Sequence, residues 1–258
     1  MNELVLSERR GRVALVTFNR PEARNAMTLE MYERLRSLCE EFAADENLRC
    51  VVFTGAGDRA FVAGTDIAEF HAFRDGDDAL RYERLMDAVF GAVENLRMPT
   101  IAAVRGFCTG GGAALATVCD LRVGGPNTRF GYPVARTLGN CLSIANYARL
   151  ERAIGAAIVK QAVFTAELLD GARLYELGYL TALTGNDDEV LPRALSIAET
   201  IAGNAPLTIE ATKEALRRVA RGDREGGDDL IVRCYTSEDF REGMRAFFEK
   251  RPVEWTGR

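Results

Sequence analysis

The chain has 258 residues, of which 47% are hydrophobic and 28% are charged, and its formal net charge is −5 at pH 7. This composition is typical of a globular protein, and the acidic balance argues against a nucleic-acid partner. The first residues lack the apolar core of a signal peptide, and no apolar run reaches the roughly 18 residues of a membrane-spanning helix. We therefore expect a cytoplasmic protein that binds neither nucleic acid nor membranes.

Cysteine and histidine, the usual ligands of structural metals, are not arranged for metal binding in this sequence. The 6 cysteines include no CxxC pair, and the single histidine, His71, is expected at the protein surface. Zinc sites combine several such ligands at short spacing, so we expect no metal and reduced thiols.

The first half of the chain alternates between strands and helices. Residues 12–19 form a β-rich segment that ends at a proline turn. Residues 28–45 have apolar side chains at helical spacing, with Thr28 as the expected N-cap. Further strands are expected at 49–57, 99–106 and 121–124, and further helices at 77–97 and 113–120. This order predicts an α/β fold with largely parallel strands.

The rest of the chain is expected to be mostly helical. Residues 188–204 and 206–221 have helical patterns that a proline separates, and residues 228–251 add more helix. We therefore expect two regions, an α/β core over residues 1–195 and a helical region over residues 196–258.

Three consecutive glycines, Gly110 to Gly112, follow the strand expected at 99–106 and precede a helix. Such a connection exposes backbone N–H groups at a helix N-terminus, where they favour a phosphate or an oxyanion formed during reaction at a carbonyl. Dinucleotide binding is disfavoured because the GxGxxG spacing is missing and Asp120 follows Gly112 by only 8 positions (120 − 112). The remaining alternative is that the glycines only allow close packing of the helix on the strand.

A second glycine-containing segment, at residues 60–70, also follows an apolar strand and precedes an expected helix. Two strand ends that each present one backbone N–H can bind the same oxygen. One such donor contributes about 3 kcal/mol to the stabilisation of a transition state. The presence of two such segments favours oxyanion binding over packing alone.

Five segments of the chain have patterns specific enough to compare with a family. They are FNRPEARNAM, AFVAGTDI, PTIAAVRGFCTGGGAALATVCDLRV, RFGYP and EDFREGMRAFFEKRPVEWTGR. In this order they resemble the crotonase superfamily, the enoyl-CoA hydratase/isomerase family, nearly end to end. The resemblance implies a spiral of ββα units with a C-terminal helical oligomerisation region, in a homotrimer or a dimer of trimers. It also implies an acyl-CoA thioester substrate, so that coenzyme A comes with the substrate and no separate cofactor is expected.

By position, the resemblance implies that the backbone amides of Thr65 and Gly111 donate to the thioester oxygen and stabilise enolate-like charge. Glycine is required at the second position because a Cβ would block the thioester. The other positions implied to bind coenzyme A are Arg24, Ala63, Asp66, Ile67, Ala68 and Gly110. Arg24 either pairs with a phosphate of coenzyme A or is a solvated surface residue, and Asp66 is also expected to cap the helix that it precedes.

The sequence departs from the family where proton transfer takes place. Hydratases of the family use two glutamates, and those positions are Ala114 and Val134 here. The further aspartate of the dienoyl isomerases corresponds to Leu142. Because these side chains transfer no protons, we do not expect hydration by two glutamates. We expect a hydratase/isomerase-type enzyme that stabilises an enolate; the alternatives are a decarboxylase of malonyl-type thioesters and a non-catalytic acyl-CoA-binding protein.

The loop at residues 131–143 occupies the place of the second glutamate and offers three polar candidates. Tyr132 would donate a hydrogen bond or pack, Arg136 would bind a substrate carboxylate, and Asn140 would polarise a water or a carbonyl. Cys141, in the same loop, is expected to be buried and structural rather than nucleophilic.

Overall fold

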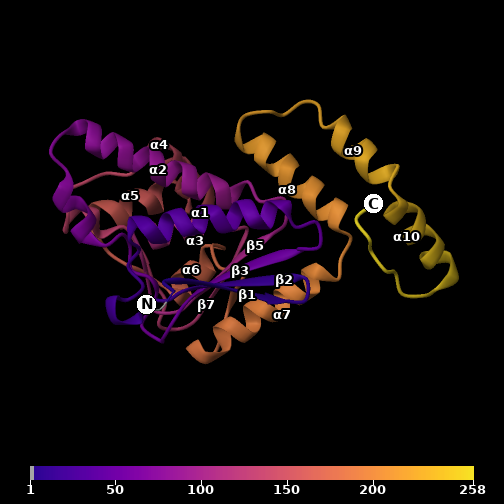
Figure 1. Ribbon diagram of the computed structural model, residues 1–258, viewed down its shortest axis with the longest axis horizontal. Coiled ribbons are helices and arrows are strands. Elements are labelled where there is room, and N and C mark those ends of the chain that lie inside the picture. Colours follow the sequence, from indigo (N-terminus) through magenta and orange to yellow (C-terminus); the bar gives the residue numbers. More distant parts are fainter. Residues whose placement is uncertain (1–2) are drawn as a thin grey trace.

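The computed structural model describes residues 3–258, which form two β-sheets surrounded by helices (Figure 1). The larger sheet has the strand order β1-β2-β3-β5-β7-β10, and the smaller sheet has the order β4-β6-β8-β9. The strands of the larger sheet are β1 (Val5–Arg10), β2 (Val13–Phe18), β3 (Cys50–Gly55), β5 (Thr100–Val104), β7 (Leu121–Gly124) and β10 (Ala182–Leu183). Those of the smaller sheet are β4 (Ala60–Val62), β6 (Phe107–Thr109), β8 (Arg129–Gly131) and β9 (Leu169–Asp170).

The α-helices follow the strands along the chain and continue to its C-terminal part. They are α1 (Leu29–Ala44), α2 (Gly76–Glu94), α3 (Gly111–Val118), α4 (Ile144–Ile154), α5 (Ala156–Thr165), α6 (Gly171–Glu176), α7 (Val190–Ala202), α8 (Pro206–Ala220), α9 (Asp228–Tyr235) and α10 (Glu238–Glu249). Each helix expected from the sequence forms within a few residues of its expected bounds.

Successive passes of the chain add one strand to each sheet. Strand β3 is followed by β4, β5 by β6, and β7 by β8, and a helix follows each of these pairs. Neighbouring strands pair parallel, except β1 with β2 and β8 with β9, which pair antiparallel. The predicted α/β class and the crotonase-like ββα spiral are therefore confirmed.

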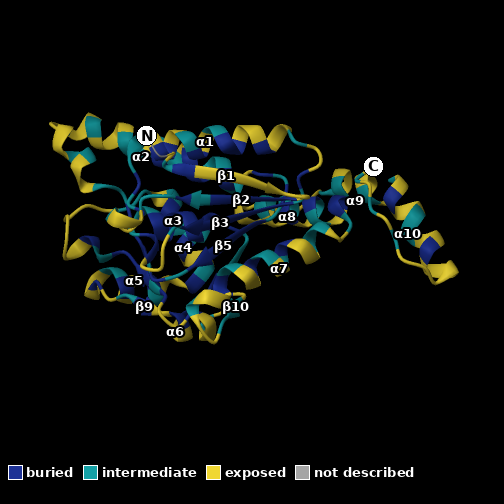
Figure 2. Ribbon diagram, turned by 60° about the horizontal axis from the view of Figure 1, so that its bottom comes forward, coloured by how far each residue is buried: buried dark blue, intermediate teal, exposed yellow. Residues whose placement is uncertain are grey.

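Both faces of the larger sheet are buried, which explains the continuous apolar runs of its strands. Ala14, Val16 and Phe18 of β2 belong to one apolar core together with α1, α2 and α3. Val13 and Leu15, which point to the opposite face, belong to a second core together with α7. Figure 2 shows the buried residues concentrated in these strands, between the helices.

Helix α1 shows how local sequence determines its own boundaries. The Thr28 hydroxyl accepts a hydrogen bond from the Met31 amide at 3.3 Å, which confirms the predicted N-cap. The side chains that this helix buries are Met31, Tyr32, Leu35, Leu38, Cys39 and Phe42. They recur three and four positions apart, so that one face of the helix covers the sheet.

The sequence pattern does not predict the short strands of the smaller sheet. Strands β4, β6 and β8 have 3 residues each. A segment of this length has no readable periodicity, and its pairing joins distant parts of the chain. Strand β1 is also missed, because most of its residues are exposed at the sheet edge. The two glycine segments therefore follow strands of the smaller sheet, β4 and β6.

Helices α8, α9 and α10 extend away from the two sheets (Figure 1). Helix α7 packs on the larger sheet instead, so the expected boundary after residue 195 falls inside that helix. Helix α8 is joined to the body by ion pairs of Lys213 with Asp120 and of Glu210 with Arg97, at 2.7 and 2.6 Å. Within residues 3–258, no helix is both long enough and apolar enough to cross a bilayer.

Candidate active site

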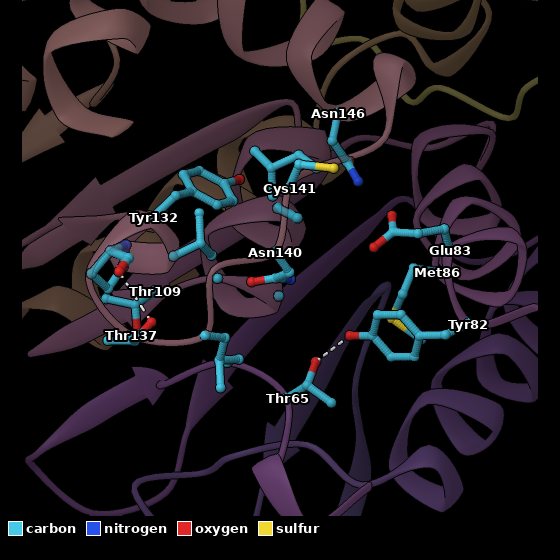
Figure 3. A pocket seen from close by; sticks show the side chains of 18 of the residues that line it. Thr65, Tyr82, Glu83, Met86, Thr109, Tyr132, Thr137, Asn140, Cys141 and Asn146 are labelled. Atoms are coloured by element: carbon cyan, nitrogen blue, oxygen red, sulfur yellow. Dashed lines mark hydrogen bonds between the residues drawn. The ribbon is translucent and has the colours of Figure 1, made fainter. Parts of the chain in front are cut away.

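A cavity of about 210 Å³ lies where the ends of β4 and β6 face helix α2 and the loop after β8 (Figure 3). Its wall includes residues 63–65 and 109–111, the two segments that carry the glycines. Side chains of α2, of α3 and of the loop after β8 complete the wall. The two segments expected to bind one oxygen are thus on the same cavity.

The two glycine segments approach each other closely. Gly64 has a φ of 114° and Gly110 a φ of 54°, which are conformations that favour glycine. A Cβ on Gly110 would lie 3.6 Å from the Cα of Gly64. A Cβ on Gly111 would overlap the hydroxyl of Tyr32 and lie 3.3 Å from Oγ1 of Thr65. Position 111 therefore requires glycine for the observed approach.

The local backbone leaves both predicted amides out of the neighbouring strand pairing and helix bonding. Met27 donates to the carbonyl of Gly64 at 2.9 Å and accepts from the amide of Asp66 at 2.9 Å. The Thr65 N–H belongs to the same trans peptide group as the Gly64 carbonyl, and the two point in opposite directions, so this N–H points away from Met27. Gly111 is the first residue of α3, where an amide has no acceptor within its helix. Both amides are therefore available as donors.

A hydroxyl network fixes the position of Thr65. Its Oγ1 lies 2.9 Å from the hydroxyl of Tyr32 on α1 and 2.6 Å from the hydroxyl of Tyr82 on α2, at hydrogen-bond distance. Burial raises the pKa of Tyr82 to about 12 and also raises the pKa of Tyr32. Both phenols are therefore neutral, and they connect the end of β4 to two helices.

The three positions where the family has carboxylates lie together in this cavity. Ala114, Val134 and Leu142 all line it, and the first two are buried. The three positions that the sequence comparison assigns to the family's carboxylates are therefore also close together in the structure. This part of the wall contains no group that transfers a proton.

Two of the three polar candidates from the loop reach the cavity. Tyr132 and Asn140 line it, whereas Arg136 is exposed and is not part of its wall. Arg136 follows the 3-10 helix η3 (Pro133–Ala135), and its amide donates to the carbonyl of Pro133. Its position gives no support to the predicted binding of a substrate carboxylate.

Cys141 and His71 are both exposed. The prediction that Cys141 is buried is wrong, because this part of the loop lies at the surface and the residue forms the edge of the cavity. His71 lies on the 3-10 helix η2 (Ile67–Ala72) and is exposed, as expected.

The hydroxyl of Tyr132 is buried without a partner. The residue is 2% exposed, and its oxygen has no hydrogen-bond partner among the residues that the structure describes. The nearby hydroxyl of Thr117 bonds to Tyr179 instead, at 3.0 Å. Burial raises the pKa of Tyr132, so its hydroxyl remains protonated and is a donor without an acceptor.

Replacing Tyr132 by phenylalanine should leave the Tm unchanged or raise it, because an unpartnered buried hydroxyl costs about 1–3 kcal/mol. If a substrate oxygen is its acceptor, the same variant should lose about tenfold in kcat/KM. Thermal unfolding and steady-state kinetics measure the two effects. The matched control is Tyr179→Phe, which removes a bonded hydroxyl and should lower the Tm. A Tyr132→Phe variant with a lower Tm and unchanged kinetics would contradict this expectation.

Three of the residues expected to bind coenzyme A line the cavity: Ala63, Ile67 and Gly110. Asp66 accepts hydrogen bonds from the amide of Ala68 at 3.1 Å and from Arg20 at 3.0 Å, so it caps η2 as predicted. These two bonds hold the pKa of Asp66 below its usual range. The carboxylate of Asp66 therefore already has hydrogen-bond partners within the protein.

Arg24 lies beside Ala63, the residue that follows β4. It is exposed with a φ of 52°, and its carbonyl accepts from the amide of Ala63 at 3.1 Å. Its guanidinium lies 5.0 Å from the centre of the Phe107 ring, a cation–π contact. Contact of Arg24 with a phosphate of coenzyme A stays a prediction.

Helix α2 adds a carboxylate that the sequence analysis missed. Glu83 lines the cavity with Met86 and Phe90, and the three lie on one helix face at positions i, i+3 and i+7. An acidic residue on the apolar face of an amphipathic helix is the signal that identifies it. Burial and the neighbouring Asp87 raise the pKa of Glu83, whereas the backbone N–H of Ser143 lowers it.

A ββα spiral that brings Thr65 and Gly111 to one cavity is typical of a protein of the crotonase type. The chain belongs to the enoyl-CoA hydratase/isomerase family, whose sequence model matches residues 8–258. It is 33% identical to the short-chain-enoyl-CoA hydratase of Clostridium acetobutylicum, over 98% of this chain and 97% of that protein.

Solved structures agree with this assignment. An enoyl-CoA hydratase/carnithine racemase of Magnetospirillum magneticum has a TM-score of 0.94 and 29% identity, covering 100% of this chain and 97% of that one. An enoyl-CoA hydratase/isomerase family protein of Hyphomonas neptunium has a TM-score of 0.93 and 30% identity, covering 99% and 98%. The predicted family is confirmed, and the protein is an enoyl-CoA hydratase-like acyl-CoA enzyme.

Proposed function

We propose that the protein binds an acyl-CoA thioester with the carbonyl oxygen between the amides of Thr65 and Gly111, and that these amides stabilise an enolate. The observation that carries this proposal is the approach of the two residues at one cavity. Fixed backbone donors need no reorganisation when charge develops, and each contributes about 3 kcal/mol. The small cavity fits a short acyl group, and the name of the Clostridium relative also specifies short-chain substrates.

Hydration by two glutamates is not proposed, because Ala114 and Val134 occupy their positions. A second candidate is decarboxylation of a malonyl-type thioester, which forms the enolate as carbon dioxide leaves and needs no base. The apolar wall that these residues form with Leu142 favours it. Glu83 opposes it, because its carboxylate would face the carboxylate of the substrate in the same cavity.

Three thioesters separate these possibilities. Butyryl-CoA, crotonyl-CoA and methylmalonyl-CoA should all bind, as measured by calorimetry. Hydration of crotonyl-CoA should be about 100- to 10,000-fold slower than by a two-glutamate hydratase assayed alongside. Release of carbon dioxide from methylmalonyl-CoA would support the decarboxylase, and binding of all three without any product would support a non-catalytic acyl-CoA-binding protein. Failure to bind any thioester would contradict the proposal.

We also infer that copies of the chain assemble through α9 and α10, as a homotrimer or a dimer of trimers. These helices leave large apolar side chains exposed, among them Ile231, Tyr235, Phe247 and Phe248. Covering such surface stabilises an assembly by about 25 cal/mol per Å² of apolar area. This supports the predicted oligomerisation role of the C-terminal helices.

A further inference from the structure

The cavity has one carboxylate among the described residues that line it, and this carboxylate belongs to Glu83 on α2. Figure 3 shows it directed away from the helix and into the cavity. The preceding residue, Tyr82, is hydrogen bonded through its hydroxyl to Oγ1 of Thr65 at 2.6 Å. This bond fixes the part of α2 that carries Glu83 beside one of the two proposed oxyanion donors.

Glu83 differs from its neighbours on α2 in its partners. Asp87 lies 3.9 Å from Arg149 and accepts a hydrogen bond from the hydroxyl of Ser143 at 2.8 Å. Glu94 pairs with Arg149 at 2.8 Å. Within the described part of the chain, no cationic side chain is at ion-pair distance from Glu83. A half-buried carboxylate without a cation can change its protonation state during a reaction.

The opposite wall of the cavity offers no competing carboxylate among the described residues. It includes Ala114, Val134 and Leu142, the neutral side chains of Tyr132 and Asn140, and the thiol of Cys141 at its edge. A proton released from an acyl group bound there therefore has Glu83 as its nearest carboxylate acceptor. Proton transfer by a positioned side chain typically contributes about 100- to 10,000-fold in rate.

We propose that Glu83 is the catalytic acid–base of this site, a role that rests on the proposed binding of a thioester. The ionised carboxylate takes a proton from Cα of the acyl group. The C–H electron pair forms the double bond between Cα and the carbonyl carbon, and the carbonyl π pair moves to the oxygen, where the amides of Thr65 and Gly111 bind it. As the enolate reverts to the thioester, protonated Glu83 returns the proton to Cα, or to Cγ of an unsaturated chain, and no other reactant is consumed.

Exchange of the α-protons of butyryl-CoA in D₂O tests this role separately from binding. By NMR, Glu83→Gln should slow exchange at least about 100-fold. By calorimetry, its Kd for butyryl-CoA should change by less than about threefold. Glu83→Asp, which retains a carboxylate, should restore part of the exchange. The matched control is Glu151→Gln, which alters an exposed glutamate on α4 and should leave both quantities unchanged.

The pH dependence of exchange gives a second readout. The other titratable or charged side chains around Glu83 are Tyr32, Tyr82, Asp87, Cys141 and Arg149. Burial and the negative charge of Asp87 raise the pKa of Glu83, so exchange should rise with pH as this carboxyl loses its proton and then level off. Asp87→Asn removes one of these causes but keeps an acceptor for Ser143, so the midpoint should move to lower pH. An unshifted midpoint would contradict the assignment to Glu83.

Stability provides a check on folding. Because the pKa of Glu83 is raised in the folded state, its ionised form destabilises that state as pH rises through the raised pKa. Glu83→Gln should therefore unfold at the same or a higher temperature than the wild type at neutral pH.

The outcomes distinguish this inference from the proposed function. Wild-type protein that does not bind butyryl-CoA contradicts the thioester site itself. Wild-type protein that binds and exchanges, with Glu83→Gln exchanging equally fast, overturns the role of Glu83 and leaves the thioester site standing. Binding without any exchange by the wild type overturns the acid–base role in the same way.

Discussion

Gly111→Ala should reduce kcat/KM by about 100- to 1,000-fold on any thioester that the protein converts, which is the effect of losing one oxyanion donor. The added Cβ would overlap the hydroxyl of Tyr32 and lie 3.3 Å from Oγ1 of Thr65. Because Tyr32 is buried and its hydroxyl is hydrogen bonded to Thr65, we expect the first turn of α3 to move, and the amide moves with it. A displacement of about 1 Å is enough to cost roughly 100-fold in rate, because the donor must lie at hydrogen-bond distance from the oxyanion. Steady-state kinetics measure the loss.

Two further variants separate loss of the donor from general damage. Gly91→Ala is the matched control, because its Cβ meets nothing within 4 Å on helix α2. This control should retain activity and gain about 0.5–1 kcal/mol of stability. In Gly111→Ala with Tyr32→Phe the overlapping hydroxyl is absent, and the remaining neighbours lie at 3.3 and 3.5 Å. The double variant should recover part of the lost activity. Full activity of Gly111→Ala alone would mean that this amide is not a donor.

The elements that depend on local sequence could be predicted, and those that depend on distant pairing could not. The N-cap Thr28 and the apolar residues at helical spacing after it are sufficient to predict α1. Strand β4 has no comparable local signal, because its 3 residues form a strand only by pairing with β6, more than 40 positions away in the chain. Both glycine segments follow these short strands. The sequence therefore identifies the two glycine segments as candidate site segments, but only the tertiary structure shows that they lie close to each other.

The same distinction applies to the candidate site. Thr65 and Gly111 lie in motifs with a recognisable pattern, and the structure places both on one cavity. Glu83 lies in no motif, and its relevance depends on which face of α2 is turned to the end of β6. Arg136 and Asn140 belong to one loop, but only Asn140 reaches the cavity. Short-range sequence rules do not determine the direction of side chains in such a loop.

Lys213→Met should have the largest effect on stability, lowering the free energy of unfolding by about 3 kcal/mol. The ammonium of Lys213 lies 2.7 Å from Oδ2 of Asp120 and donates to the carbonyl of Met98 at 3.0 Å. Asp120 also accepts from the amide and the hydroxyl of Thr100, at 2.7 and 2.9 Å. Methionine fills similar space but leaves the carboxylate without its cation. Because the side chain of Asp120 is 29% exposed, solvent compensates in part, and we expect the low end of the range for buried pairs.

Urea denaturation of Lys213→Met, Asp120→Asn and the double variant measures the coupling between the two side chains, which should be at least about 1 kcal/mol. Lys160→Met is the matched control, because Lys160 is exposed on α5 and its replacement should change stability by less than about 0.5 kcal/mol. The lost pair connects α8 to the body, and α8 connects to the exposed apolar helices α9 and α10. Hydrogen exchange should therefore increase first over residues 206–258, before the sheets lose protection. Equal stability of Lys213→Met and the wild type would mean that the pair of Lys213 with Asp120 does not help to hold these helices on the body.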